Sequence, residues 1–272
     1  VIKVRHKLVV SGRKVSWEWR GPDWSPMDER FVENYRRAVF DGQIFKDYLA
    51  YMYGYPAGYG GMGPCPYMLY YDDMSVWPFF LACRPAERHM GDIDLNDYVL
   101  APAVYMVSGR PCVALKESPS RLTARAARMR TPAVFRTTIY LDRARDFIPL
   151  RFIIRDPEPG KGKIDDLQIE YQRSDQGLWV PKAWRYVAIT NGKLVSASEA
   201  RCTSFRFPQR LEPDAFSLNF PPGTYVQDDG NRTAYLIRED GSKQFITKSN
   251  IPDWLDQTVR AEAARLGMDV AE

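Results

Sequence analysis

Short strand patterns separated by turn residues recur along most of the chain, and this recurrence limits the folds that the chain can adopt. Apolar and polar residues alternate in runs such as "VIKVRHKLVV" and "RKVSWEWR", which is typical of strands with one buried face. Turn dipeptides that favour hairpins follow these runs: Ser11-Gly12, Asp41-Gly42, Ser108-Gly109 and Asn191-Gly192. Little helical pattern lies between the strands, so parallel βαβ folds are excluded because their crossovers need helices.

The pattern therefore predicts a mainly β protein built on a single curved antiparallel sheet. We expect one domain over residues 1–250 and a C-terminal helix and tail over residues 251–272. The helix signals at this end are Asn250 as a cap, an Ala/Leu/Arg-rich body and Gly267 as the stop. A few other short helices are expected.

Composition narrows the class of partner. The 272 residues carry 38 basic and 34 acidic side chains and are 45% hydrophobic, as in a globular protein with a sizeable core. The densest basic stretch, Arg121–Arg130, has no interleaved aromatic residues, so nucleic-acid binding is not expected. No run of 18 apolar residues occurs, and we expect a chain that is peripheral to a membrane at most.

The four cysteines leave two interpretations open. Their spacing lacks C-x-x-C, and the chain has only two histidines, which argues against zinc. Two disulfides in an oxidising compartment is the preferred reading, with Cys65–Cys83 and Cys112–Cys202 as the suggested pairs; four free thiols is the alternative. The chain begins at Val1, so we expect a processed or trimmed chain whose signal peptide or lipid anchor would already be missing.

Catalytic patterns are missing from the sequence. His6 lies in a strand pattern and His89 in a polar turn, and neither has a motif partner. G-x-S-x-G, H-E-x-x-H and the phosphate-binding G-x-x-x-x-G-K-[ST] do not occur. The prediction is a protein without catalytic residues, metal site or cofactor, and not an enzyme.

Residues 51–73, "YMYGYPAGYGGMGPCPYMLYYDD", hold seven of the sixteen tyrosines and five glycines. A disordered tract should be poor in aromatic residues, and this one is rich in them. We predict a lid or rim loop, with additional core or a protein-protein contact as alternatives. The residues expected on this lid or partner surface are Tyr51, Tyr53, Tyr55, Tyr59, Met62, Tyr67 and Tyr70.

Four stretches in the second half carry a resemblance to a known family. They are "TTIYLDRARDFIPLRFIIRD", "GLWVPKAWRYVAITNGKLVSASEARCTSF", "DAFSLNFPPGTYVQDD" and "AYLIREDGSKQFIT". Over about residues 98–250 the chain resembles the LolA/LolB-like superfamily of outer-membrane lipoprotein-sorting proteins, as an uncharacterised bacterial branch. The stretches also have readings of their own: Pro181 marks an edge or a bulge, and Gly223 of "FPPGT" supplies a turn conformation.

The resemblance implies a half-barrel whose apolar concave side is closed by helices or loops and holds acyl chains. It implies a periplasmic or otherwise extracytoplasmic protein that binds a lipid or a lipoprotein's acyl chain. The alternative is a structural subunit or sensor domain of a cell-envelope assembly, with an envelope protein as partner and a filled cavity. Alternation selects the side chains expected to line the interior: Trp17, Trp19, Phe40, Phe45, Phe79, Phe80, Trp179 and Trp184.

Overall fold

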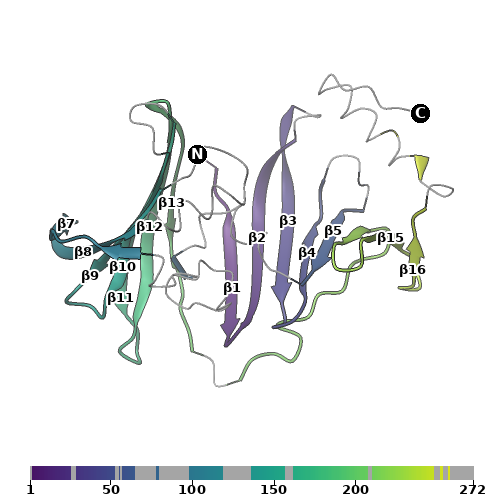
Figure 1. The fold of residues 1–272 in the computed structure, drawn as a ribbon. Coiled ribbons are helices and arrows are strands. Elements are labelled where there is room, and N and C mark those ends of the chain that lie inside the picture. The colour runs from purple at the N-terminus through teal and green to yellow at the C-terminus, as the bar shows by residue number, and fades with distance from the viewer. Residues whose placement is uncertain are drawn as a thin grey trace. The chain divides into compact units, whose positions relative to one another are not determined.

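The computed structural model describes residues 2–25, 29–52, 55, 57–64, 78–79, 98–118, 136–156, 162–207, 210–247, 252–253 and 257. The chain divides into two compact units, each with its own sheet (Figure 1). Unit 1 comprises Val1–Leu69 and Arg210–Glu272, and unit 2 comprises Tyr70–Gln209. The protein is mainly β, as predicted, but it has two sheets where a single curved sheet was expected.

Sheet 1 of unit 1 has the strand order β1-β2-β3-β4-β5-β14-β15-β16. Its strands are β1 (Arg5–Ser11), β2 (Lys14–Ser25), β3 (Arg30–Phe40), β4 (Phe45–Leu49), β5 (Tyr59–Gly63), β14 (Tyr225–Asp228), β15 (Thr233–Ile237) and β16 (Lys243–Phe245).

One pair in sheet 1 is parallel, which the sequence pattern did not indicate. β5 and β14 run side by side with Tyr59 opposite Tyr225, while the other neighbouring strands of sheet 1 are antiparallel. Parallel neighbours need a long crossover, usually a helix. Here all of unit 2 lies between β5 and β14 in the chain, so a whole folded unit takes the place of the crossover helix.

Sheet 2 of unit 2 is antiparallel and has the strand order β13-β12-β11-β10-β9-β8-β6. β7 also pairs with β8. Its strands are β6 (Tyr98–Leu100), β7 (Tyr105–Val107), β8 (Arg110–Glu117), β9 (Arg136–Asp142), β10 (Ile148–Arg155), β11 (Lys163–Arg173), β12 (Trp179–Thr190) and β13 (Lys193–Arg201).

Each unit packs apolar side chains on its sheet. In unit 1, Trp17 on β2 is 2% exposed and lies opposite Ala38 of β3 in the register, and Val226 and Tyr235 pack together on β14 and β15. In unit 2, residues of β8 to β12 form one buried cluster that includes Ile139 and Leu167. Burial of apolar surface of this kind is the main force that stabilises such sheets.

The predicted turns are present where they depend only on neighbouring residues. Asn191 and Gly192 join β12 to β13 with φ of 51° and 74°, as a two-residue hairpin requires. Gly223 has φ of 82°, and a Cβ there would lie 2.7 Å from the Cβ of Ala57, so both the turn and the close approach require glycine.

Helical structure is sparse in the part of the chain that the structure describes, where it is confined to Pro78, Phe79, Asp253 and Gln257. Most of the C-terminal helix expected over residues 251–272 lies outside the described residues. No helix among the described residues is long and apolar enough to cross a membrane.

Candidate functional site: an aromatic face on sheet 2

A bulge in β12 positions two tryptophans on one side of sheet 2. Tyr171 of β11 pairs with Pro181 and the preceding Glu170 pairs with Ala183, so Lys182 is an extra residue on β12. Residues five positions apart point to opposite faces of a regular strand, but the extra residue returns Trp179 and Trp184 to the same face. Both pack against the buried cluster of unit 2. Pro181 thus sits at a bulge, as the sequence suggested.

Aromatic rings extend outward from Trp184. Its side chain is 8% exposed, and the ring of Phe79 meets it edge-on with 5.4 Å between the centroids. Phe79 also stacks on Phe205 at 6.4 Å, and Phe205 meets Phe207 at 4.9 Å. Phe207 is 41% exposed, so the row of rings runs from the buried cluster to solvent. We call Phe79, Trp179, Trp184, Phe205 and Phe207 the aromatic face.

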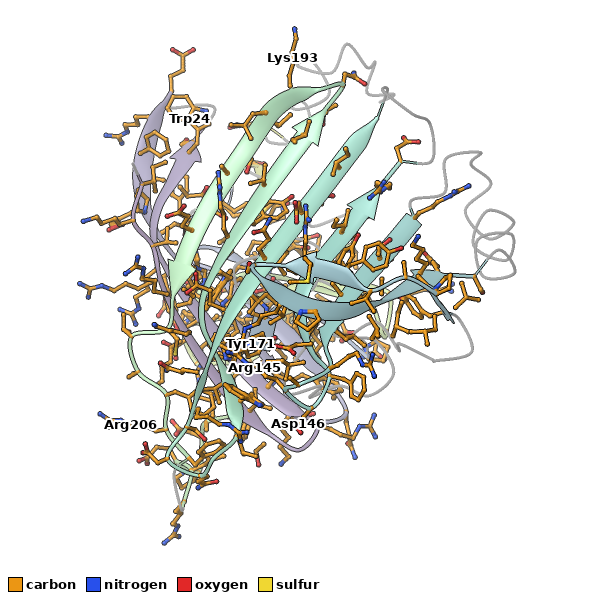
Figure 2. All side chains as sticks on the ribbon, turned by 90° about the vertical axis from the view of Figure 1, so that its left-hand side faces the viewer. Trp24, Arg145, Asp146, Tyr171, Lys193 and Arg206 are labelled. Atoms are coloured by element: carbon orange, nitrogen blue, oxygen red, sulfur yellow. The ribbon has the colours of Figure 1, made fainter. Side chains whose placement is uncertain are left out.

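Two arginines contact the ring of Trp179. The guanidinium carbon lies 4.5 Å from the ring centroid for Arg145 and 4.2 Å for Arg173, within the range of cation–π attraction. Arg173 is opposite Trp179 in the β11–β12 register. Arg145 also lies 3.6 Å from the fully buried carboxylate of Asp142. Figure 2 shows Arg145, Asp146 and Tyr171 at one end of sheet 2 and Lys193 at the other.

The two indole N–H groups are unusual because they are buried without an acceptor. The Nε1 atoms of Trp179 and Trp184 are inaccessible to solvent and donate no hydrogen bond to any described residue. A buried donor left unpaired costs about 1–3 kcal/mol, so unpaired groups in a native structure call for an explanation. The aromatic face therefore combines apolar rings with two unused donors.

The eight predicted lining residues are divided between the two units. Trp17, Trp19, Phe40 and Phe45 belong to sheet 1, where Trp19 is half-buried and the others are buried. Phe79, Trp179 and Trp184 come together in unit 2, and Phe80 lies outside the described residues. Phe205 and Phe207 were not among the predicted lining residues, although the alternating "FRF" after β13 was a signal for them.

Within residues 51–73, Tyr59–Gly63 form strand β5 of sheet 1, where a lid or rim loop was expected. Tyr59 and Met62 lie on β5, and Tyr55 contacts both Tyr59 and Tyr225 with 5.4 and 5.2 Å between ring centroids. Tyr51 exchanges backbone hydrogen bonds with the Asn34 side chain and pairs its hydroxyl with Ser25. The predicted lid residues Tyr53, Tyr67 and Tyr70 lie outside the described residues.

Packing changes the acidity of two tyrosines. Burial, with smaller contributions from Tyr55 and Tyr225, raises the pKa of Tyr59 to about 12. Burial and the 2.6 Å hydrogen bond that its hydroxyl donates to Asp165 raise the pKa of Tyr186.

The cysteine pairing predicted across sheet 2 is absent. Cys112 on β8 and Cys202 after β13 are both free thiols. Four other strands separate β8 from β13 in the sheet order, whereas disulfide partners have Cα atoms about 4.4–6.8 Å apart. Cys65 and Cys83 lie outside the described residues. Among the described residues, no group of three or more His, Cys, Asp or Glu side chains is arranged to hold a metal ion.

Fold and site together define a mainly β protein of two sheets with an aromatic face on the second. Comparison of the chain with protein-family models, with curated proteins and with solved structures gives no match. The resemblance to the LolA/LolB-like superfamily therefore stays a prediction that rests on the sequence motifs.

Proposed function

We propose that this chain is a non-enzymatic binding protein that holds an apolar ligand, a lipid or the acyl chain of a lipoprotein, on the aromatic face of sheet 2. The observation that supports this best is the continuous row of rings from Trp184 through Phe79 and Phe205 to Phe207. An acyl chain has only apolar surface to offer, and aromatic rings give it large contact areas. Exposed Phe207 is the point at which a chain would first meet the rings.

The proposal includes an extracytoplasmic location in a bacterium. This part is supported by the motif resemblance alone. The free thiols of Cys112 and Cys202 do not add to it.

Binding of the apolar fluorescent probe N-phenyl-1-naphthylamine, and its displacement by palmitate, tests the proposal. We expect Phe207→Ser to weaken probe binding several-fold, up to about tenfold, because part of a phenyl contact is lost. Phe207 is 41% exposed, so its replacement should leave the unfolding temperature nearly unchanged.

Phe31→Ser provides the matched control. Phe31 is 52% exposed, lies on β3 of unit 1 and is not part of the aromatic face. Its loss should leave probe affinity as in the unmodified protein. Equal weakening by both substitutions, or no saturable probe binding at all, would count against the proposal.

An exposed apolar edge favours a second candidate function, that of an interaction subunit in an envelope assembly. β6 and β7 lie along one edge of β8, and the residues in and between them expose large apolar side chains. The exposed fractions are 49% for Val99, 63% for Leu100, 57% for Val104 and 66% for Met106. Apolar surface gathered at a sheet edge is a common feature of protein contacts.

Sedimentation velocity over a range of concentrations separates this candidate from the first. If the edge joins copies of the chain, Leu100→Asp with Met106→Asp should abolish concentration-dependent association without weakening probe binding. A monomer at every concentration, with or without the two substitutions, would leave self-association through this edge without support.

A further inference from the structure

We infer that the tip of the β2–β3 hairpin docks unit 1 onto a lipid bilayer that carries anionic phospholipids, with Trp24 and Phe31 as the side chains that enter the bilayer. Both residues lie on sheet 1, on a surface that the proposed function does not use.

The hairpin continues past its neighbours in sheet 1. β1 pairs with β2 only as far as Arg20, and β4 pairs with β3 only from Arg36 onward. Residues 22–25 of β2 pair with residues 30–33 of β3 and with no third strand among the described residues. The end of the hairpin is thus a two-stranded ribbon, and Figure 2 shows Trp24 near its free end.

One face of this ribbon is covered and the other is open. Ser25 is 1% exposed, and its hydroxyl oxygen lies 2.9 Å from that of Tyr51. On the opposite face, Trp24 and Phe31 are partners in the register, and their rings meet edge-on with 5.2 Å between the centroids. Their exposed fractions are 49% and 52%. The two rings therefore form a small apolar surface of fixed geometry at the tip.

Basic side chains share the face of the two rings. Alternate residues of a strand point to the same face, so Arg20 and Trp24 lie on one face of β2. The register adds Arg5, which is opposite Arg20, and Lys7, which is opposite Glu18. Arg5, Lys7 and Arg20 are exposed, and none of them makes an ion pair with a described residue.

Acidic side chains on this face are fewer than the basic ones. Glu18 lies 3.8 Å from Arg37 of β3, so its charge is balanced. Glu33 is the other acidic side chain that β1, β2 and β3 place on this face, and it is exposed. The face that leads to the apolar tip therefore carries an excess of positive charge.

A bilayer with anionic headgroups matches both features. Tryptophan and other amphipathic rings favour the boundary between headgroups and acyl chains, and each Lys or Arg near an anionic surface strengthens binding about fivefold. A protein partner fits the tip less well, because a stable protein interface buries about 800 Å² on each side and the tip offers two half-exposed rings.

Flotation of the full chain with lipid vesicles tests the inference. The vesicles contain phosphatidylcholine alone or an equimolar mixture of phosphatidylcholine and phosphatidylglycerol. We expect binding to the mixed vesicles that weakens as salt is added, because salt screens the charges, and little binding to phosphatidylcholine alone. Arg5→Gln with Lys7→Gln should weaken binding to the mixed vesicles at least about fivefold.

Loss of the two rings is the more specific change. Trp24→Ser with Phe31→Ser should weaken binding to the mixed vesicles about tenfold or more, because the apolar contact is removed. Leu194→Ser with Val195→Ser is the matched control. These two residues are 66% and 65% exposed on β13 of unit 2, and their replacement should leave vesicle binding unchanged.

Quenching of tryptophan fluorescence by lipids brominated in their acyl chains gives an independent readout on the unmodified chain. We expect these lipids to quench part of the fluorescence and Trp24→Phe to remove that part. The substitution keeps an aromatic ring at the tip, so most of the vesicle binding should remain. This readout decides the question even if the serine variant does not fold.

Four outcomes would overturn the inference. They are no binding to the mixed vesicles, binding that is unchanged without the two rings, quenching that persists in Trp24→Phe, and self-association through the tip in place of vesicle binding. Probe binding reports on the aromatic face and flotation on the hairpin tip, so the proposed function and this inference can fail separately.

Discussion

Gly60 and Gly61 are neighbours on β5 that face opposite sides of sheet 1, and their surroundings differ sharply. A Cβ on Gly60 would lie 2.7 Å from Cε1 of Phe220 and 3.1 Å from a methyl carbon of Val226. A Cβ on Gly61 would meet nothing nearer than 3.9 Å. Glycine at position 60 is therefore a packing requirement, whereas position 61 has room for a side chain.

This contrast predicts different outcomes for two chemically identical substitutions. Gly60→Ala should lower the free energy of unfolding by about 1–3 kcal/mol, because the added methyl group overpacks the contact with Phe220. Gly61→Ala should change it by about 0.5 kcal/mol or less. Urea unfolding of the two variants measures both values. Equal losses would show that the packing over Gly60 is not as described.

Tyr59 gives a prediction for alkaline pH. Its pKa is raised from 10.0 to about 12 in the folded protein, chiefly by burial. The folded state thus holds the hydroxyl proton more tightly than the unfolded state. The resulting stability is fully present below about pH 10, and it is lost as the pH rises through about 12.

Tyrosinate absorbance during an alkaline titration measures this pKa. The difference between the unmodified protein and Tyr59→Phe should show a transition centred near pH 12. A transition centred near pH 10 would mean that Tyr59 is not shielded by Tyr55 and Tyr225.

At the scale of elements, the bulge in β12 predicts which deletions the aromatic face tolerates. If Lys182 is deleted, the bulge disappears, and the regular ladder keeps Pro181 opposite Tyr171 and Trp179 opposite Arg173. If Val180 is deleted instead, a regular ladder places Lys182 opposite the buried Tyr171. Deletion of Val180 should therefore cost at least about 1–3 kcal/mol more than deletion of Lys182, because a lysine enters the cluster.

Thermal and urea unfolding of the two deletion variants compare these costs. Deletion of Lys182 also removes the carbonyl that accepts the backbone N–H of Cys202, so some loss is expected there as well. A larger loss for Lys182 than for Val180 would contradict the assigned register.

The elements that the sequence predicted are those specified by neighbouring residues. The Asn191-Gly192 and Ser108-Gly109 hairpins are present, each with both turn residues at positive φ. Alternation also selected Phe79, Trp179 and Trp184, which meet in unit 2. The arginines at Trp179 could not be predicted, because the contact of Arg145 depends on a hairpin that approaches β12 only in the folded unit.

At the scale of the whole molecule, the division into two sheets depends on a pairing between distant residues. Tyr59 and Tyr225 are adjacent across the parallel β5–β14 pair, yet all of unit 2 separates them in the chain. Strand patterns reveal which residues are extended and which face is apolar, but not which strands pair across such a distance. For this reason "YGGMG" within residues 51–73 was predicted as a loop and is instead a strand of sheet 1.

Native mass spectrometry of the purified chain, before and after incubation with palmitate, shows directly whether this protein holds an acyl ligand. We expect a complex whose added mass equals one acyl-chain ligand, which is lost on denaturation and is less populated after Phe207→Ser. A polypeptide that keeps its bare mass under both conditions would contradict it.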